Sequence, residues 1–338
     1  MNILITGGAG GIGSTLALHL THKGHNVVAY DNLNNGYIEN LSEDDRPFCM
    51  FVNADIRNTQ RMLLTIDYHN IDVIIHLAAL TSLPECESVP AECLSVNVAG
   101  TASVLHAARL RNKKVIVAST SAIYERNEKA DAPFTEYIDV NPRLMYPLSK
   151  KMMEDLIQSC IKNYDMDITT LRFFNVFGPR QDIHRKSPPL INFIVREIAA
   201  NRPITFFSNG EQQRDYIHVD DVVTMIDACI NNPAAKQQTF NLCTGTLTSV
   251  KDIIGYAERA FEMKLEHNFE QPKEFWSGYP ILKEGTPLKD SVLEHEVNKF
   301  SLGSRIKAQK LLGWTPNLHI EELMIDTMRK NYELYTKN

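Results

Sequence analysis

The stretch that decides the fold is Asn2-Ile3-Leu4-Ile5-Thr6-Gly7-Gly8-Ala9-Gly10-Gly11-Ile12-Gly13. Its apolar first half predicts a buried strand, and the apolar spacing after it predicts one face of a helix up to Gly24. Between strand and helix, Gly7, Gly10 and Gly13 let the backbone approach a pyrophosphate, which then meets the N-terminus of the helix. We therefore interpret the stretch as a dinucleotide-binding loop; the alternative is a tight turn without a ligand.

Short β-branched runs alternate with helical stretches through the first half of the chain. The clearest predicted helices cover Asn97–Leu110 and Lys150–Lys162, and the predicted strands cover Asn2–Ile5, Val27–Tyr30, Phe48–Val52, Val73–Leu77, Val115–Ala118 and Ile168–Arg172. This alternation predicts an α/β fold with a doubly wound parallel sheet of the Rossmann type.

The texture of the sequence changes beyond about Asn175, where Pro and Gly recur and the predicted strands become shorter. This change predicts a second, smaller mixed α/β domain that binds the substrate. We expect residues 1–175 to form the dinucleotide-binding domain and residues 215–243 to return to it, with Thr239–Leu242 as a strand of the large sheet. Residues 176–214 and 244–338 are then expected to form the substrate-binding domain.

The composition of the 338-residue chain is 43% hydrophobic and 22% charged with a net charge of −6, which gives no electrostatic reason to expect nucleic acid or a membrane as partner. No apolar run is long enough for a transmembrane helix, and the first residues lack the features of a signal peptide, so we expect a cytoplasmic protein. The six cysteines form no Cys-x-x-Cys pair and are expected to be reduced thiols. The eleven histidines show no ligand spacing, so no metal is expected.

Further candidates for cofactor binding follow the predicted strands. Asp31 ends the second strand, where a carboxylate accepts hydrogen bonds from the adenine ribose and repels a 2′-phosphate; this favours NAD over NADP. The alternative is a turn Asp, because Asn34-Asn35-Gly36 follows closely. Asp55-Ile56-Arg57 either brackets the adenine or forms a surface turn, and His76 is interpreted as a packed, hydrogen-bonded histidine. The residues expected to bind the cofactor are Gly7, Gly10, Gly11, Ile12, Gly13, Asp31, Asn32, Asp55, Ile56, Leu77, Ala78, Ala79, Asn97, Tyr146 and Lys150.

Tyr146 and Lys150 stand four residues apart, so a helix places them on one face. A free tyrosine has a pKa near 10, and we expect the ammonium of Lys150 and a positive nicotinamide ring to lower it, which would make Tyr146 an acid and base. Thr120 is expected to hydrogen-bond the reacting oxygen, with Ser119 and Ser121 as alternatives for that hydroxyl. The predicted catalytic residues are thus Thr120, Tyr146 and Lys150.

With these residues in place, the chain resembles the extended short-chain dehydrogenases/reductases, specifically the nucleotide-sugar epimerase/dehydratase branch. The resemblance covers nearly the whole chain and rests on ordered motifs. They are Thr6–Gly13, Asp55-Ile56-Arg57, His76-Leu77-Ala78-Ala79, Asn97-Val98-Ala99-Gly100-Thr101, Ser119–Tyr124, the Tyr146/Lys150 pair, Arg172–Gln181, Gly210–Asp221, and Lys307-Ala308 before Leu312-Gly313-Trp314.

The resemblance implies oxidation and reduction at a sugar carbon. In the family the hydroxyl residue four before the Tyr of the V-Y-G motif is catalytic, which is Thr120 before Tyr124 here. Dehydratases and decarboxylases carry acidic residues at the positions of Ser121 and Ala122, so those reactions are not expected. The expected function is NAD-dependent 4-epimerisation of a nucleotide-diphosphate sugar by a homodimer. A 4-ketosugar reductase is the first alternative, and a non-catalytic dinucleotide-binding protein the second.

The resemblance also implies the substrate-binding residues Ser82, Ser121, Asn175 and Arg214. Arg214 would bind the diphosphate, and its alternative is a salt bridge with Asp215 or Asp220. Asn97 resembles an Asn near the active site, with a helix N-cap as its alternative.

The chain also departs from the family pattern at several positions. Relatives carry a second phosphate-binding Arg near residues 294–297, where this chain has Glu294-His295-Glu296-Val297. Either Lys289, Lys299 or Arg305 substitutes for that Arg, or the head of the substrate is bound differently. Ser301 falls where relatives gate the size of the sugar, and a small residue there would admit an N-acetyl group. Glu125 replaces a glycine after Tyr124, and Gly11 replaces a bulky residue of the cofactor loop.

Overall fold

The computed structural model describes residues 1–43, 46–125, 132–182, 184–271, 274, 276, 278–285 and 287–337. The described helices are α1 (Gly11–His22), α2 (Thr59–Tyr68), α3 (Leu83–Ser88), α4 (Pro90–Leu94), α5 (Thr101–Leu110), α6 (Met145–Tyr164), α7 (Leu190–Ala199), α8 (Val219–Ile230), α9 (Val250–Phe261), α10 (Asp290–Asn298), α11 (Ile306–Leu312) and α12 (Ile320–Lys337).

The largest sheet is the predicted Rossmann sheet. Its seven strands lie in the order β12-β8-β7-β6-β1-β2-β5, and every neighbouring pair is parallel. The bounds of these strands are β1 (Asn2–Thr6), β2 (Asn26–Asp31), β5 (Met50–Asn53), β6 (Val73–His76), β7 (Lys114–Thr120), β8 (Ile168–Phe173) and β12 (Thr239–Leu242).

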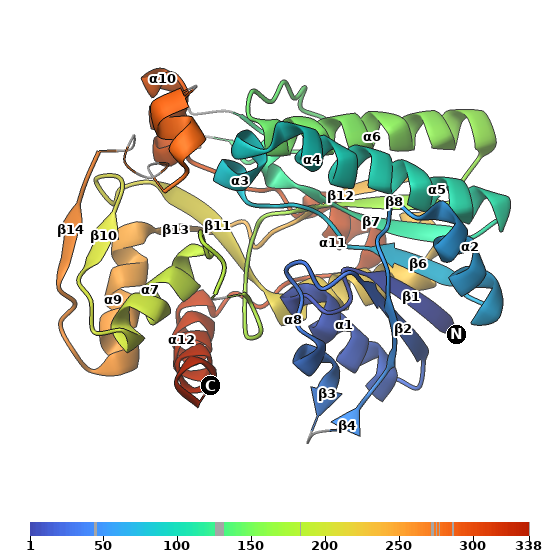
Figure 1. Cartoon of the computed structure of the whole chain (residues 1–338), viewed down its shortest axis with the longest axis horizontal. Coiled ribbons are helices and arrows are strands. Elements are labelled where there is room, and N and C mark those ends of the chain that lie inside the picture. The colour runs from blue at the N-terminus through green and yellow to red at the C-terminus, as the bar shows by residue number, and fades with distance from the viewer. Residues whose placement is uncertain are drawn as a thin grey trace.

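Helices cover both faces of this sheet, as Figure 1 shows. On one face, α2, α5 and α6 pack against side chains such as Leu4, Ile74 and Val117. On the other face, α1 and α8 pack against Ile3 and Ile5. Alternate residues of a strand point to opposite faces, so the strands are apolar on both sides and the doubly wound fold is confirmed.

The smaller domain lies beside the large sheet (Figure 1) and has its own core between α7, α9 and α12. Its strands are short: β9 (Asn175–Phe177), β11 (Gln213–His218) and β13 (Leu247–Ser249) form one sheet, and β10 (Ile204–Phe206) pairs with β14 (His267–Phe269). Far from these, β3 (Ser42–Glu43) pairs with β4 (Arg46–Pro47). Although residues 244–338 were expected in the second domain, α11 packs against β12, and Ala308 and Trp314 join the core beneath the large sheet.

Two predicted elements differ from the observed ones near the site. The helix expected over Asn97–Leu110 is a π-helix at Ser95–Gly100 that continues into α5, and such π-segments occur frequently at functional sites. The helix expected from Lys150 begins at Met145, because the first turn contains Pro147, which is well tolerated there. Tyr146 and Lys150 therefore both lie in the first two turns of α6.

None of the helices in the described part of the chain has the length and apolar character needed to span a bilayer. All six cysteines are free thiols. Among the described residues, no three His, Cys, Asp or Glu side chains are grouped so that they could hold a metal ion.

Candidate active site

The glycine loop lies at the carboxyl edge of the large sheet, between β1 and α1. Gly7 has a positive φ of 69°, and a Cβ on it would lie 2.8 Å from the backbone nitrogen of Ala78. This close approach requires glycine, and it brings the loop against the residues that follow β6. The turn is closed by a hydrogen bond from the Gly10 nitrogen to the Gly7 oxygen of 3.2 Å, and α1 begins directly after it. The first N–H groups of α1 have no partner within the helix, which suits a pyrophosphate.

A cavity of about 290 Å³ opens beside this loop, over the ends of β1, β2 and β6. Of the predicted cofactor residues, Gly7, Gly10, Asp31, Asn32, Asp55, Ile56, Leu77, Ala78 and Ala79 line it. Gly11, Ile12 and Gly13, in the first turn of α1, lie outside the lining, and so do the other predicted residues Asn97, Tyr146 and Lys150. Arg57, from the segment considered for the adenine, also lines the cavity. The remaining lining residues were not predicted from the sequence: Tyr30, Asn34, Asn35, Gly36, Ala54, Leu80, Glu85, Val89, Glu92 and Val96.

Asp31 holds the loops that surround the cavity. One carboxylate oxygen accepts from the backbone nitrogen of Ala9 at 3.0 Å, and the other accepts from that of Leu33 at 2.8 Å. Burial raises the pKa of this carboxyl, and the N–H groups of Leu33 and Ala9 act against the rise. Asp31 is thus a turn residue and a wall of the cavity at once, so its two interpretations are compatible.

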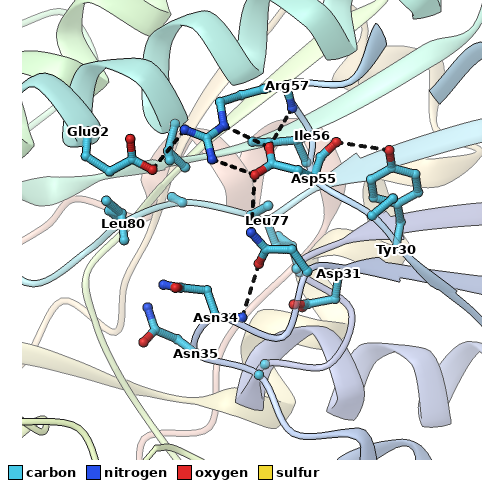
Figure 2. Close-up of a pocket in the computed structure, with 18 of the residues that line it drawn as sticks. Tyr30, Asp31, Asn34, Asn35, Asp55, Ile56, Arg57, Leu77, Leu80 and Glu92 are labelled. Carbon is cyan, nitrogen blue, oxygen red and sulfur yellow. Dashed lines mark hydrogen bonds and ion pairs between the residues drawn. The ribbon is translucent and has the colours of Figure 1, made fainter. Parts of the chain in front are cut away.

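The Asp55-Ile56-Arg57 segment lines the cavity next to Asp31, since the Asn32 amide donates to Asp55 at 3.3 Å. The Arg57 guanidinium forks onto Asp55, with Nη2 at 2.6 Å from Oδ2, and Nη1 lies 2.8 Å from a carboxylate oxygen of Glu92. Its hydrogen bond to Asp55 lowers the pKa of that carboxyl. Figure 2 shows this cluster above the cavity and the amides of Asn34 and Asn35 on the far side. Asn34, Asn35 and Gly36 line the cavity, and the Asn-Asn-Gly motif after the second strand is the sequence feature that could have indicated them.

Thr120, Tyr146 and Lys150 meet at the end of β7. Tyr146 hydrogen-bonds Thr120, and the ammonium of Lys150, only 4% exposed, donates to the Ala118 carbonyl at 2.9 Å. Burial raises the pKa of Tyr146 to about 12, while the Thr120 hydrogen bond and the charge of Arg185 act to lower it. Burial also lowers the pKa of Lys150 to about 8.

In this structure the pKa of Tyr146 is raised and not lowered. Desolvation of the phenolate outweighs the groups that act to lower the value, which include Thr120 and Arg185. A lower pKa therefore requires additional positive charge beside the phenol, and an oxidised nicotinamide ring is such a charge. The expected lowering by Lys150 together with the nicotinamide ring stays a prediction.

The three candidate hydroxyls of Ser119-Thr120-Ser121 have separate roles. Ser119 donates to Glu154 at 2.5 Å, and Glu154 also forms a buried ion pair with Arg172 at 2.7 Å. Thr120 is the hydroxyl bonded to Tyr146, and it also accepts from the Ala122 nitrogen at 3.1 Å. Ser121 begins a 3₁₀ turn and is buried. The geometry therefore selects Thr120.

Asn97 is a positioning residue. Its amide, 1% exposed, accepts from the Leu80 nitrogen at 2.8 Å and donates to the Leu80 oxygen and to Ser149 at 2.9 Å each. It caps no helix, since it lies inside the π-segment. All its strong hydrogen bonds are internal, so it acts on the site by fixing the loop after β6 against α6 rather than by the direct cofactor contact that we expected.

His76 is a buried structural histidine, as predicted. Its ring nitrogens lie 2.7 Å from the Thr6 hydroxyl and 2.9 Å from that of Thr101. Burial lowers the pKa of His76 to about 3, so the ring is neutral and ties β6 to β1 and α5.

The predicted substrate residues lie around the same edge. Ser82 is 5% exposed, and its buried hydroxyl has no hydrogen-bond partner in the described part of the chain. Asn175 donates to the Asp215 carbonyl at 3.1 Å. Arg214 donates to the Glu296 carbonyl at 2.9 Å and to the Lys299 carbonyl. The alternative of a salt bridge from Arg214 to Asp215 or Asp220 is wrong, because its charge is held by backbone oxygens.

Asp215 instead organises the strand ends of the smaller domain. Its carboxylate accepts from the nitrogen and hydroxyl of Thr244 at 2.8 and 2.7 Å, from the Gly245 nitrogen at 2.8 Å and from the Gly303 nitrogen at 3.2 Å. Ser301 pairs with this strand through its backbone and is buried.

A Rossmann sheet with this glycine loop, an acidic residue after β2 and a paired tyrosine and lysine defines a dinucleotide-dependent enzyme of the short-chain dehydrogenase/reductase class. The chain belongs to the NAD dependent epimerase/dehydratase family, whose profile matches residues 3–243. Its cofactor is accordingly NAD, and the residues present fit it, since Gly7, Gly10 and Asp31 face one cavity.

Relatives and solved structures agree with this family. The chain is 31% identical to the UDP-glucose 4-epimerase of Mycolicibacterium smegmatis over 97% of each chain, and 30% identical to the putative UDP-glucose 4-epimerase of Methanocaldococcus jannaschii over 95% of each chain. The UDP-glucose 4-epimerase of Thermotoga maritima, solved with UDP-glucose, is 26% identical, has a TM-score of 0.85 and covers 100% of both chains.

Proposed function

We propose that this chain is an NAD-dependent 4-epimerase of a nucleotide-diphosphate sugar. The observation that carries the proposal is the hydrogen-bonded pair of Thr120 and Tyr146, which lies at the same sheet edge as the cofactor cavity. The relatives named as UDP-glucose 4-epimerases, and a more distant one named as a UDP-glucuronate 4-epimerase, support the reaction type.

The roles of the residues follow from their chemistry. Bound NAD supplies the hydride acceptor and later the donor. Tyr146 takes the proton of the C4 hydroxyl and returns it after the 4-keto sugar has turned over. Thr120 hydrogen-bonds the reacting oxygen, and Lys150 holds the nicotinamide ribose while its carbonyl partner on β7 fixes its position. Asn175 and Arg214 bind the diphosphate, and Ser82 and Ser121 contact the sugar.

Dehydration is disfavoured by the residues beside this pair. Elimination of water needs a further acid and base at the sugar, and Ser121 and Ala122 supply neither. A ketosugar reductase uses the same tyrosine and differs only in releasing its cofactor after each turnover.

The experiment separates these two reactions. The protein is purified without added cofactor, its bound NAD is measured after denaturation, and UDP-, dTDP-, GDP- and CDP-sugars are supplied while products are identified by NMR. An epimerase retains NAD and converts a sugar without consuming added NADH. Stoichiometric oxidation of NADH with a ketosugar would instead establish a reductase.

We further propose a cytoplasmic homodimer with the expected domain division, except that α11 and Trp314 belong to the dinucleotide-binding domain. Six free thiols suit a reducing compartment. Leu110 of α5 and Met152 and Tyr164 of α6 expose apolar surface on the outer helices, which supports association there. Measurement of the mass in solution tests the dimer.

A further inference from the structure

A nucleotide diphosphate carries two phosphates, and Arg214 is the one predicted cation at the substrate edge. The three residues expected to replace the missing arginine either have other contacts or lie at the surface. Lys299 is buried and paired with Glu296 at 2.8 Å, and Lys289 is exposed at the start of α10. The guanidinium of Arg305 lies against Gly245, 2.9 Å from the position of an added Cβ. The second anionic group of the substrate therefore needs another partner.

Arg185 lies in the segment between β9 and α7, which is held in place at several points. Asp182 accepts from the backbone nitrogens of His184 and Arg185 at 2.9 and 3.1 Å, and from the Tyr37 hydroxyl at 2.9 Å. Arg196 of α7 donates to the Arg185 carbonyl at 3.3 Å. These contacts fix the backbone of Arg185 between the turn after β2 and the smaller domain.

The segment that carries Arg185 reaches the side-chain cluster beside Tyr146. The Ser187 hydroxyl lies 3.2 Å from that of Tyr279, and Tyr279 packs against the cluster that contains Leu83 and Leu144. Leu144 stands two residues before Tyr146, so this cluster borders the catalytic tyrosine. In agreement, the positive charge of Arg185 acts to lower the pKa of Tyr146, against the larger effect of burial.

The guanidinium of Arg185 is oriented but not neutralised. Its Nε donates to the Ser187 carbonyl at 2.7 Å, which leaves the two terminal nitrogens to face away from that bond. Within the described residues no carboxylate forms an ion pair with it, whereas Arg172, Arg196 and Arg202 each have one. A partly buried, unpaired guanidinium beside a reaction centre is suited to a bidentate oxyanion.

We propose that Arg185 is the second anion-binding residue of the substrate site and binds an anionic oxygen group next to the reacting sugar. This inference rests on the proposed function for the identity of the ligand as a nucleotide sugar. Two groups have the required chemistry, namely the β-phosphate of the diphosphate and a carboxylate on the sugar. Both place the negative charge close to Tyr146, where the guanidinium also stabilises the phenolate.

The test measures binding to the NAD-loaded protein by calorimetry. Arg185→Gln removes the charge, Arg185→Lys keeps a charge but loses the fork, and Lys186→Gln is the matched control. Lys186 is adjacent and carries the same charge, but its ammonium lies over the Tyr279 ring at 4.3 Å. The probes are a nucleoside monophosphate and diphosphate of the base that the wild type binds best, a neutral nucleotide sugar and the corresponding nucleotide uronate.

If the β-phosphate is the partner, Arg185→Gln lowers the affinity for the nucleoside diphosphate and for both nucleotide sugars by about tenfold or more, and the affinity for the monophosphate does not change. Arg185→Lys then restores part of the lost affinity. If a sugar carboxylate is the partner, Arg185→Gln lowers only the affinity for the nucleotide uronate. Equal affinity of wild type and Arg185→Gln for all four probes overturns the proposal. A loss that includes the monophosphate, or that Lys186→Gln reproduces, overturns it as well.

Failure of the proposed function has a different signature. If the wild type binds nucleotide sugars without epimerising them, the function is wrong and the role of Arg185 is still decided by the four affinities. If the wild type binds none of the diphosphates, both proposals are overturned. Thermal melting of each variant shows that the affinities are compared between folded proteins.

Discussion

Ser119 and Thr120 are neighbours on β7, yet their hydroxyls serve different parts of the molecule. Ser119 donates to Glu154 at 2.5 Å, within the buried network that also contains Arg172, and Thr120 bonds Tyr146. Because successive side chains of a strand point to opposite faces, one residue stabilises the fold and the next one reaches the site.

This division predicts opposite effects for two matched substitutions. Thr120→Val keeps the shape but removes the hydrogen bond to the reacting oxygen, so we expect turnover to fall about a hundredfold with little change in melting temperature. Ser119→Ala leaves a buried carboxylate with one donor fewer, which costs about 1.5–3 kcal/mol of unfolding free energy, while turnover stays within a few-fold. NMR assays of epimerisation and urea denaturation measure both. An active Thr120→Val variant would assign the reaction to another hydroxyl.

The role of Tyr146 predicts a steep dependence of rate on pH. Burial raises its pKa to about 12, so the phenolate that accepts the substrate proton is scarce at neutral pH. Below this pKa the phenolate fraction grows about tenfold per pH unit, and the rate is expected to rise with pH until the pKa of the complex is reached. A rate that stays constant from acidic to alkaline pH, with no rising limb, would contradict the assignment.

Tyr146→Phe checks the same residue by removal. We expect turnover to fall about 10²- to 10⁴-fold, because the acid and base are lost, while bound NAD is retained. Tyr137→Phe is the control, since Tyr137 is 79% exposed. Substantial epimerisation by Tyr146→Phe would show that another group carries the proton.

Asp31 predicts the choice of dinucleotide. Replacement by Asn removes the charge that repels a 2′-phosphate, so the preference for NAD over NADP should narrow by about tenfold. Part of the NAD affinity is lost too, because one oxygen becomes an amide that opposes the N–H of Ala9. Competition between the two dinucleotides measures the ratio, with Asp72→Asn as a surface control. If the ratio of NAD to NADP affinity does not change, Asp31 acts only in the turn and does not select the dinucleotide.

Replacement of Asp215 is expected to lower the stability of the fold. Asp215→Asn replaces one acceptor oxygen by a donor that faces backbone N–H groups, so we expect about 3 kcal/mol of lost unfolding free energy. Asp220→Asn is the control, because the Asp220 side chain is 74% exposed. Urea denaturation measures the unfolding free energy of both variants. Equal stability of the two would show that the hydrogen bonds of Asp215 do not stabilise the fold.

Local patterns were sufficient to predict the sheet and the glycine loop. The period of apolar residues decides strand or helix within a few residues, and the position of Asp31 follows from the strand before it. Thr120 stays the predicted catalytic hydroxyl, and the contact of Ser119 with the Glu154–Arg172 ion pair, which the sequence did not reveal, gives Ser119 a different partner.

Contacts between distant segments were not predictable in this way. Arg214 is held by carbonyls more than eighty residues away, and a search for nearby carboxylates gave the wrong partner. The pKa of Tyr146 was predicted to fall because sequence spacing reports the charges near a group but not its desolvation. Arg185 lies in the segment between β9 and α7, and its position relative to Tyr279 and α7 depends on contacts between distant parts of the chain.

The contact between Gly11 and the carbonyl of Arg180 joins the two halves of the molecule. A Cβ on Gly11 would lie 2.7 Å from that oxygen, so the start of α1 and the segment leading to Arg185 are seated directly on each other. The start of α1, where the pyrophosphate is expected to bind, is therefore positioned partly by the smaller domain's side of the molecule. A bulkier side chain at this one glycine should push the two segments apart and weaken the hold on the dinucleotide.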